Sequence, residues 1–143
     1  MTEPAEEAIE ELLAAAAEAR ANAYAPYSGF RVGAAVLAGG RVFPGANVEI
    51  ASYPISVCAE RSAISAMVAA GERSIDAIAV VTDADEPTPP CGGCRQAIWE
   101  FGREAAVVSQ AASGTTLRSS IGDLLPHAFG PESFRPEPSP ELS

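Results

Sequence analysis

Apolar residues recur every three or four positions in three stretches of the chain, a spacing that predicts amphipathic helices. The first stretch, residues 4–23, has acidic residues between its apolar positions Ile9, Leu12, Leu13 and Ala16. The second covers residues 58–70 and is followed by Gly71, a residue that commonly ends helices. The third begins at Cys91 and ends near Gly102. The pattern therefore predicts three main helices.

Shorter apolar runs between these stretches have the length and flanking turns of β-strands. Residues 30–37 and 41–46 flank Gly39-Gly40, which is typical of a hairpin with a tight turn. Further strands are expected at residues 75–81, 105–109 and 115–118, followed by a helical turn over residues 121–128. The polar, Pro-containing segments 47–57 and 82–90 are expected to be irregular.

Strands alternate with helices after residue 58, which favours a partly parallel sheet with helices on both faces. The chain has 143 residues, a length that fits one α/β domain. We assign this domain to residues 1–130. The Pro-rich segment 131–143 is expected to be a mobile tail.

Charge and composition narrow the classes of ligand. The chain has 19 acidic residues against 9 arginines and no lysine, with a net charge of −10. Because nucleic acids are bound largely through Lys and Arg contacts to phosphate, a small uncharged ligand is favoured over a nucleic acid polymer. The apolar runs are shorter than the ~18 residues of a membrane span, and the acidic N-terminus is unlike a secretory signal. We therefore expect a cytoplasmic protein without a membrane partner.

The three cysteines all fall at predicted helix starts, Cys58 in one helix and Cys91 and Cys94 in the next. Helix N-termini present free N–H groups and a partial positive charge, which stabilise thiolate. Thiolate is the form that binds zinc. One helical turn separates Cys91 from Cys94, so their sulfurs face the same side. We predict that the three sulfurs bind one Zn²⁺.

Three protein ligands, rather than four, are typical of a catalytic zinc site, which keeps one position for water. Glu60 is then placed to take a proton from that water and deliver it to a substrate nitrogen. Three thiolates and Zn²⁺ leave one surplus negative charge, which Arg61 and Arg95 are the candidates to offset. Two alternatives stay open: a structural site with His127 as fourth ligand, and a redox-active cysteine pair.

Four segments, in this order, resemble the small homotetrameric zinc-dependent cytidine deaminases over residues 24–129: AYAPYSGFRVGAAV, NVEIASYPISVCAERSAI, PCGGCRQAIWEFG and DLLPHAFG. The resemblance implies a three-layer α/β/α fold with a five-stranded mixed sheet and active sites built where subunits meet. It also implies hydrolytic deamination of cytidine and deoxycytidine to uridine and deoxyuridine, with release of ammonia, as in pyrimidine salvage. Cys58 stands where the dimeric and polynucleotide branches have His, which favours the tetrameric branch.

By position, the resemblance also implies contacts with a nucleoside. Phe30 would pack on the pyrimidine ring, and Asn47 and Glu49 would hydrogen-bond the ribose hydroxyls. The backbone at Ala59 and Cys91 would read the base. The remaining residues either surround the metal ligands (Arg61, Arg95 and Gln96) or come from neighbouring subunits (Ala51, Tyr53 and Phe129).

Simpler interpretations exist for some of these residues. Asn47 and Glu49 are common as loop caps, and an aromatic residue such as Phe30 on a strand is commonly part of the core. The chain also departs from the family at Ile50, where Asn is usual, and an apolar side chain cannot replace the hydrogen bonds of an amide. Two further functions stay open: deamination of a modified or antibiotic cytosine nucleoside, and a non-catalytic zinc-bearing binding module.

Overall fold

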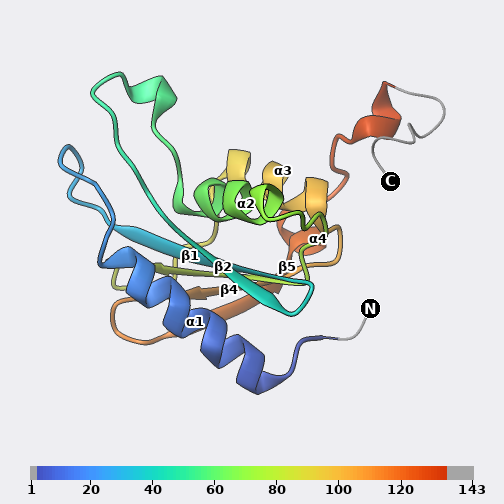
Figure 1. Ribbon diagram of the computed structural model, residues 1–143, viewed down its shortest axis with the longest axis horizontal. Coiled ribbons are helices and arrows are strands. Elements are labelled where there is room, and N and C mark those ends of the chain that lie inside the picture. Colours follow the sequence, from blue (N-terminus) through green and yellow to red (C-terminus); the bar gives the residue numbers. More distant parts are fainter. Residues whose placement is uncertain (1–2, 135–143) are drawn as a thin grey trace.

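The computed structural model describes residues 3–134, which fold into a single sheet between two helical layers (Figure 1). In chain order, the helices and strands are α1 Glu6–Arg20, β1 Val32–Ala38, β2 Arg41–Ala46, α2 Ala59–Ala69, β3 Ala77–Thr82, α3 Gly92–Phe101, β4 Ala106–Gln110, β5 Thr116–Ser120 and α4 Ile121–Leu124. Two short 3-10 helices, η1 Tyr53–Ile55 and η2 Pro131–Ser133, complete the set. The expected elements are confirmed, with ends that differ by a few residues.

The sheet has five strands in the order β2-β1-β3-β4-β5. Only the β3–β4 pair is parallel, and the other three pairs are antiparallel. The predicted mixed sheet is therefore confirmed. β2 lies at the edge, where Pro44 is tolerated because an edge strand need not donate every backbone N–H to a neighbour.

Two apolar layers hold the sheet between the helices. On one face, α1 packs its buried residues Ile9, Leu12 and Ala16 against alternate residues of β1, β3 and β4. On the other face, α2, α3 and α4 pack against the opposite set of residues. All six residues of β3 are buried, as expected for a strand covered on both faces.

A glycine on the edge strand brings α2 close to the sheet. A Cβ at Gly45 would lie 2.4 Å from the backbone N of Ala63 and 2.6 Å from the carbonyl O of Ala59. Any larger residue would push this helix outward, because those atoms are backbone and cannot rotate away. Gly45 therefore sets the position of the first turn of α2, which carries Glu60.

Two expectations from the sequence are refined. The segment 47–57 was expected to be irregular and contains η1. The expected tail, residues 131–143, begins with η2, and its residues 135–143 lie outside the described part of the chain. No helix among residues 3–134 is long and apolar enough to cross a bilayer.

Candidate active site

A cavity of about 300 Å³ opens beside the N-termini of α2 and α3. This volume is at the lower end of the range for small-molecule sites. Its walls come from the segments before β1 and after β2, from the end of β3, and from the loop that leads into α3. Seven of the candidate residues line it, namely Phe30, Asn47, Glu49, Cys58, Ala59, Glu60 and Cys91. Half of the fourteen candidate site residues therefore lie around one space.

The three cysteine sulfurs meet beside this cavity, which Cys58 and Cys91 line. Cys58 is the N-cap of α2, Cys91 is the N-cap of α3, and Cys94 lies one turn further on. All three Sγ atoms lie within 4.8 Å of one another, close to the ~3.8 Å separation expected for tetrahedral zinc–thiolate bonds of ~2.3 Å. Among residues 3–134 this is the only such group of potential ligands, and His127 does not belong to it.

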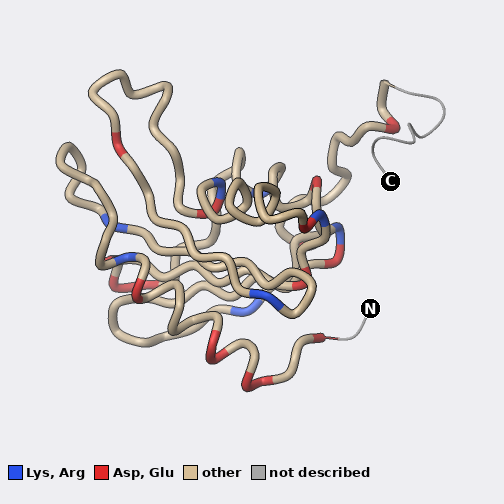
Figure 2. The backbone as a smooth tube through the Cα atoms, in the orientation of Figure 1, with Lys and Arg blue, Asp and Glu red and all other residues tan. Residues whose placement is uncertain are grey.

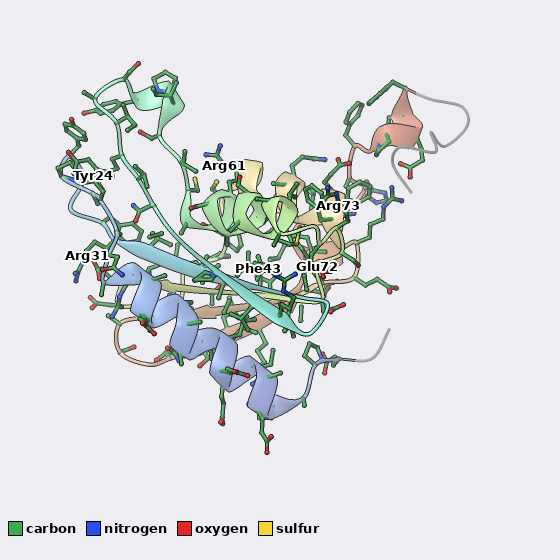
Figure 3. All side chains as sticks on the ribbon, in the orientation of Figure 1. Tyr24, Arg31, Phe43, Arg61, Glu72 and Arg73 are labelled. Carbon is green, nitrogen blue, oxygen red and sulfur yellow. The ribbon has the colours of Figure 1, made fainter. Side chains whose placement is uncertain are left out.

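Arg61 is the positively charged residue that contacts the cysteine sulfurs. Its Nη2 donates to Cys58 Sγ at 3.3 Å, and Figure 3 shows it at the start of α2. Arg95 makes different contacts: Nε donates to the carbonyl of Pro90 at 2.7 Å and Nη1 to that of Leu124 at 2.9 Å. Arg95 therefore joins the loop before Cys91 to α4, and Arg61 alone of the two contacts a thiolate ligand.

The sulfurs and the neighbouring acid shift each other's protonation. A hydrogen bond from Cys94 and the Arg61 guanidinium lower the pKa of Cys58 to about 5, although burial acts in the opposite direction. Glu60 is only 5% exposed, and burial, together with the charge of Cys58, raises the pKa of its carboxyl group. A thiolate and a carboxyl group that holds a proton more readily than usual thus lie side by side.

Asn47 and Glu49 both organise the loop between α1 and β1. Asn47 Oδ1 accepts from the N–H of Val32 at 2.8 Å, and its Nδ2 donates to the carbonyl of Phe30 at 2.9 Å. Glu49 accepts from the backbone N–H groups of Tyr27 and Ser28, each at 3.0 Å, and from the Ser28 hydroxyl. The loop-cap interpretation therefore holds for both, while both also line the cavity.

Other candidates lie outside the lining of this cavity. Ala51, Tyr53 and Phe129 are exposed, the last two by 68% and 61%. Phe129 is held by Gln96, whose Nε2 donates to its carbonyl at 2.8 Å. Ile50 donates its backbone N–H to Ser56 Oγ and does not line the cavity. The structure therefore gives no direct contact through which Ile50 alters a ligand in this chain.

Sequence reasoning missed two hydroxyl groups of the cavity. Thr82 and Thr88 line it, and their Oγ1 atoms lie 3.4 Å apart. Thr82 was assigned to the irregular segment 82–90, whereas it is the buried last residue of β3, with 1% of its surface exposed. Its position at the carboxyl end of a buried strand was the available signal, since ligands commonly bind there in α/β folds.

The charge pattern agrees with an uncharged ligand. Acidic residues follow the outer side of α1, and arginines are dispersed over several elements of the described chain (Figure 2). No two of the arginines in residues 3–134 are adjacent in the sequence, and nucleic acid polymers are bound largely through clustered Lys and Arg.

Comparisons with known proteins agree with this site. Residues 6–110 match the family model for the cytidine and deoxycytidylate deaminase zinc-binding region. The cytidine deaminase of Sporosarcina psychrophila is 43% identical over 128 residues, which cover 88% of this chain and 94% of that protein. That of Halalkalibacterium halodurans is 44% identical over 125 residues, covering 86% and 95%.

Solved structures show the same similarity. The crystal structure of cytidine deaminase from Burkholderia pseudomallei has a TM-score of 0.81 and 48% identity, covering 84% of this chain and 98% of that one. The structure of cytidine deaminase from Mycobacterium tuberculosis has a TM-score of 0.75 and 39% identity, covering 85% and 97%. The family-model match, over residues 6–110, includes every residue that lines the cavity.

Proposed function

This chain belongs to the family of cytidine and deoxycytidylate deaminases, and on this premise we propose that it hydrolyses cytidine and deoxycytidine to uridine and deoxyuridine. Water supplies the oxygen that becomes O4 of the product, and the exocyclic amine leaves as ammonia. The reaction returns cytosine nucleosides to the uracil nucleoside pool, which is a step of pyrimidine salvage.

One observation carries this proposal: three sulfurs meet within 4.8 Å of one another beside the buried carboxyl group of Glu60, and Cys58, Cys91 and Glu60 line a cavity. Sulfur donors select zinc, and three of them leave one coordination position for solvent. Cys58, Cys91 and Cys94 would hold the ion. When bound, zinc supplies a Lewis acid that activates water for hydrolysis near neutral pH.

Glu60 moves the protons in this proposal. Its carboxylate accepts a proton from the attacking water and donates one to the ring nitrogen next to C4, which makes the ring carbon more electrophilic. A second transfer through the same carboxyl group protonates the amine, so that it leaves as ammonia. Burial suits this role because it keeps bulk water from competing for the protons.

The rest of the cavity orients the nucleoside. Phe30, 38% exposed, offers a ring face to the pyrimidine. Asn47 and Glu49 keep unused acceptor and donor capacity on atoms that already order the loop, and ribose hydroxyls would fill that capacity. The backbone groups at Ala59 and Cys91, beside the metal ligands, would bind the polar edge of the base.

A direct assay tests the activity. Purified protein is expected to convert cytidine and deoxycytidine to the uracil nucleosides, followed by ultraviolet absorbance and by ammonia release. Treatment with a chelator should abolish turnover, and added Zn²⁺ should restore it. Nucleoside binding without ammonia release would instead favour a non-catalytic module, and turnover restricted to sugar-modified or base-modified analogues would favour the modified-nucleoside alternative.

The active site is proposed to be shared between subunits of a homotetramer. Large aromatic side chains such as Tyr53 and Phe129 are exposed and lie outside the cavity of their own chain, and they are available for contact with another subunit. We propose that they, with Ala51, reach the cavity of a neighbouring subunit. We also propose a cytoplasmic location, since thiols that bind zinc must remain reduced.

Mixing two inactive variants tests the shared site. A Glu60→Gln subunit supplies an intact Phe129, and a Phe129→Ala subunit supplies an intact Glu60. Subunits refolded or co-expressed together are expected to show more activity than the sum of the two separate variants, and light scattering should give four times the 14.7 kDa chain mass. Strictly additive activity, or a monomer, would contradict the proposal.

A further inference from the structure

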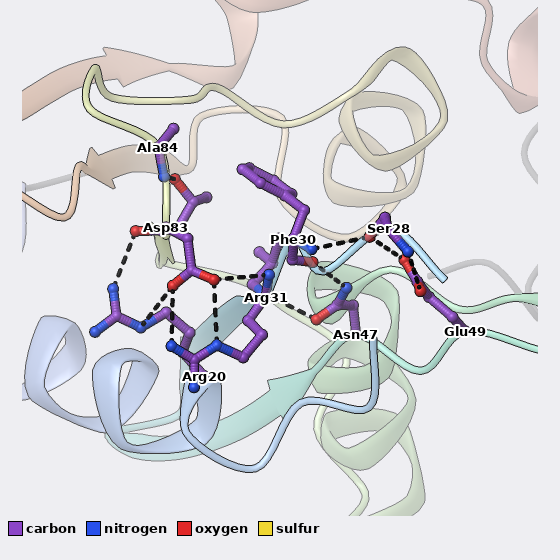
Figure 4. Close-up of polar contacts among 10 residues, drawn as sticks. Arg20, Ser28, Phe30, Arg31, Asn47, Glu49, Asp83 and Ala84 are labelled. Atoms are coloured by element: carbon purple, nitrogen blue, oxygen red, sulfur yellow. Dashed lines mark hydrogen bonds and ion pairs between the residues drawn. The ribbon is translucent and has the colours of Figure 1, made fainter. Parts of the chain in front are cut away.

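Asp83 lies outside the cavity, yet it contacts the segment that carries the cavity's aromatic wall. Antiparallel pairing of β1 with β3 ends at Val32 opposite Thr82. One residue beyond this last pair, the side chain of Asp83 bonds to β1's preceding residue in place of a backbone carbonyl. Its Oδ2 accepts from the backbone N–H of Arg31 at 3.1 Å (Figure 4). The carboxylate thus extends the attachment between these strands by one residue.

The side chain of Arg31 strengthens this attachment. Its Nε donates to Oδ2 of Asp83 at 3.1 Å and its Nη2 to Oδ1 at 3.4 Å. Arg20, from the last turn of α1, places its Nε 3.8 Å from Oδ1 and donates through Nη1 to the carbonyl of Thr82 at 3.0 Å. Partial burial opposes ionisation, but Arg31 keeps the pKa of the Asp83 carboxyl group below its usual range. The acceptor is therefore anionic at neutral pH.

The segment held by Asp83 is held from its other side by Asn47. Arg31 stands between Phe30 and Val32, both of which line the cavity. Asn47 binds the carbonyl of Phe30 and the N–H of Val32. The segment is thereby fixed at three consecutive residues, with Asp83 holding the middle one.

From this arrangement we infer that Asp83 is a positioning residue for nucleoside binding: by holding the backbone of Arg31, it keeps Phe30 and Asn47 in the geometry that receives the substrate. The inference rests on the proposed function, because it takes the cavity to be the nucleoside site. In that proposal Phe30 stacks on the pyrimidine ring and Asn47 binds the ribose, and neither side chain exchanges a proton or forms a bond with the reacting atoms. Loss of their alignment therefore weakens binding of substrate and product alike and raises KM more than it lowers kcat.

The test compares Asp83→Ala and Asp83→Asn with the unchanged enzyme on cytidine. Hydrogen bonds to charged groups correspond to roughly 10–100-fold in an equilibrium constant. Asp83→Ala is therefore expected to raise KM, and the inhibition constant of uridine, about tenfold or more, with kcat within about twofold. Asp83→Asn keeps an acceptor for the Arg31 N–H, so its increase should be smaller. Arg31→Ala keeps the backbone N–H itself and should also cost less than Asp83→Ala.

Asp85→Asn is the matched control, because it removes a charge from the same loop, and no hydrogen bond or ion pair of its side chain is found in the described chain. Its KM should be unchanged. A merely structural role for Asp83 would reduce the fraction of active protein, which lowers apparent kcat at constant KM. That result, or an Arg31→Ala effect equal to that of Asp83→Ala, would overturn the inference. An unchanged enzyme that does not deaminate cytidine would overturn the proposed function instead.

Discussion

Replacing Glu60 with glutamine is expected to lower kcat for cytidine by at least ~10²-fold, and by as much as ~10⁴-fold, the range associated with a positioned general acid–base. The glutamine side chain has nearly the same shape, but it can neither accept the proton of water nor deliver it to the ring nitrogen. Glu60 is 5% exposed, so bulk water cannot readily substitute for it. Steady-state kinetics on cytidine, followed at the ultraviolet difference between substrate and product, measure the loss.

Three further measurements distinguish a catalytic from a structural role of Glu60. Zinc content should stay as in the unchanged protein, because the sulfurs alone form the ligand group. The unfolding temperature should not fall, because a neutral amide is less costly to bury than a carboxylate. Glu7→Gln makes the same chemical change in the first turn of α1, at an exposed position, and should retain full activity. A Glu60→Gln protein with normal zinc and normal kcat would refute the role.

The metal ligands and their neighbours could be anticipated because the relevant physics is local. Helix starts follow from apolar spacing, and cysteines at helix starts are stabilised as thiolates wherever those helices lie. That the two starts converge was a hypothesis, and the 4.8 Å limit on the sulfur separations confirms it. The hairpin of β1 and β2 was likewise predictable from Gly39 and Gly40, both of which adopt positive φ.

Contacts between distant segments could not be read from the chain in this way. The spacing of apolar residues identifies β1 and β3 but not that they are neighbours, and the attachment of Asp83 to Arg31 depends on that pairing, 52 residues apart. The hydrogen-bond partners of the Arg95 side chain were also unpredictable, because one of them, the carbonyl of Leu124, comes from α4. Asn47 was identified by its motif, but its two backbone partners became visible only in three dimensions.

Replacing Cys94 with serine is expected to remove both zinc and activity. Serine preserves the volume, but its hydroxyl is a harder and far less acidic ligand than a thiol, so the ion loses one of three protein bonds. Changes to residues that merely support metal ligands already reduce metal affinity ~10–100-fold, and loss of a direct ligand should reduce it at least as much. Metal analysis after dialysis should therefore find zinc well below that of the unchanged protein, with cytidine turnover reduced in parallel.

The other two cysteines provide the control, because they differ in burial but share the proposed role. Cys94 is buried, Cys58 is partly buried and Cys91 is exposed. If the cysteines mattered only through packing, the substitution by serine would lower activity and the unfolding temperature most at Cys94. The same substitution at Cys91 would change both very little. If they bind one ion together, all three substitutions should lose zinc and activity to a similar extent. Full zinc occupancy in Cys91→Ser would therefore exclude the three-sulfur site.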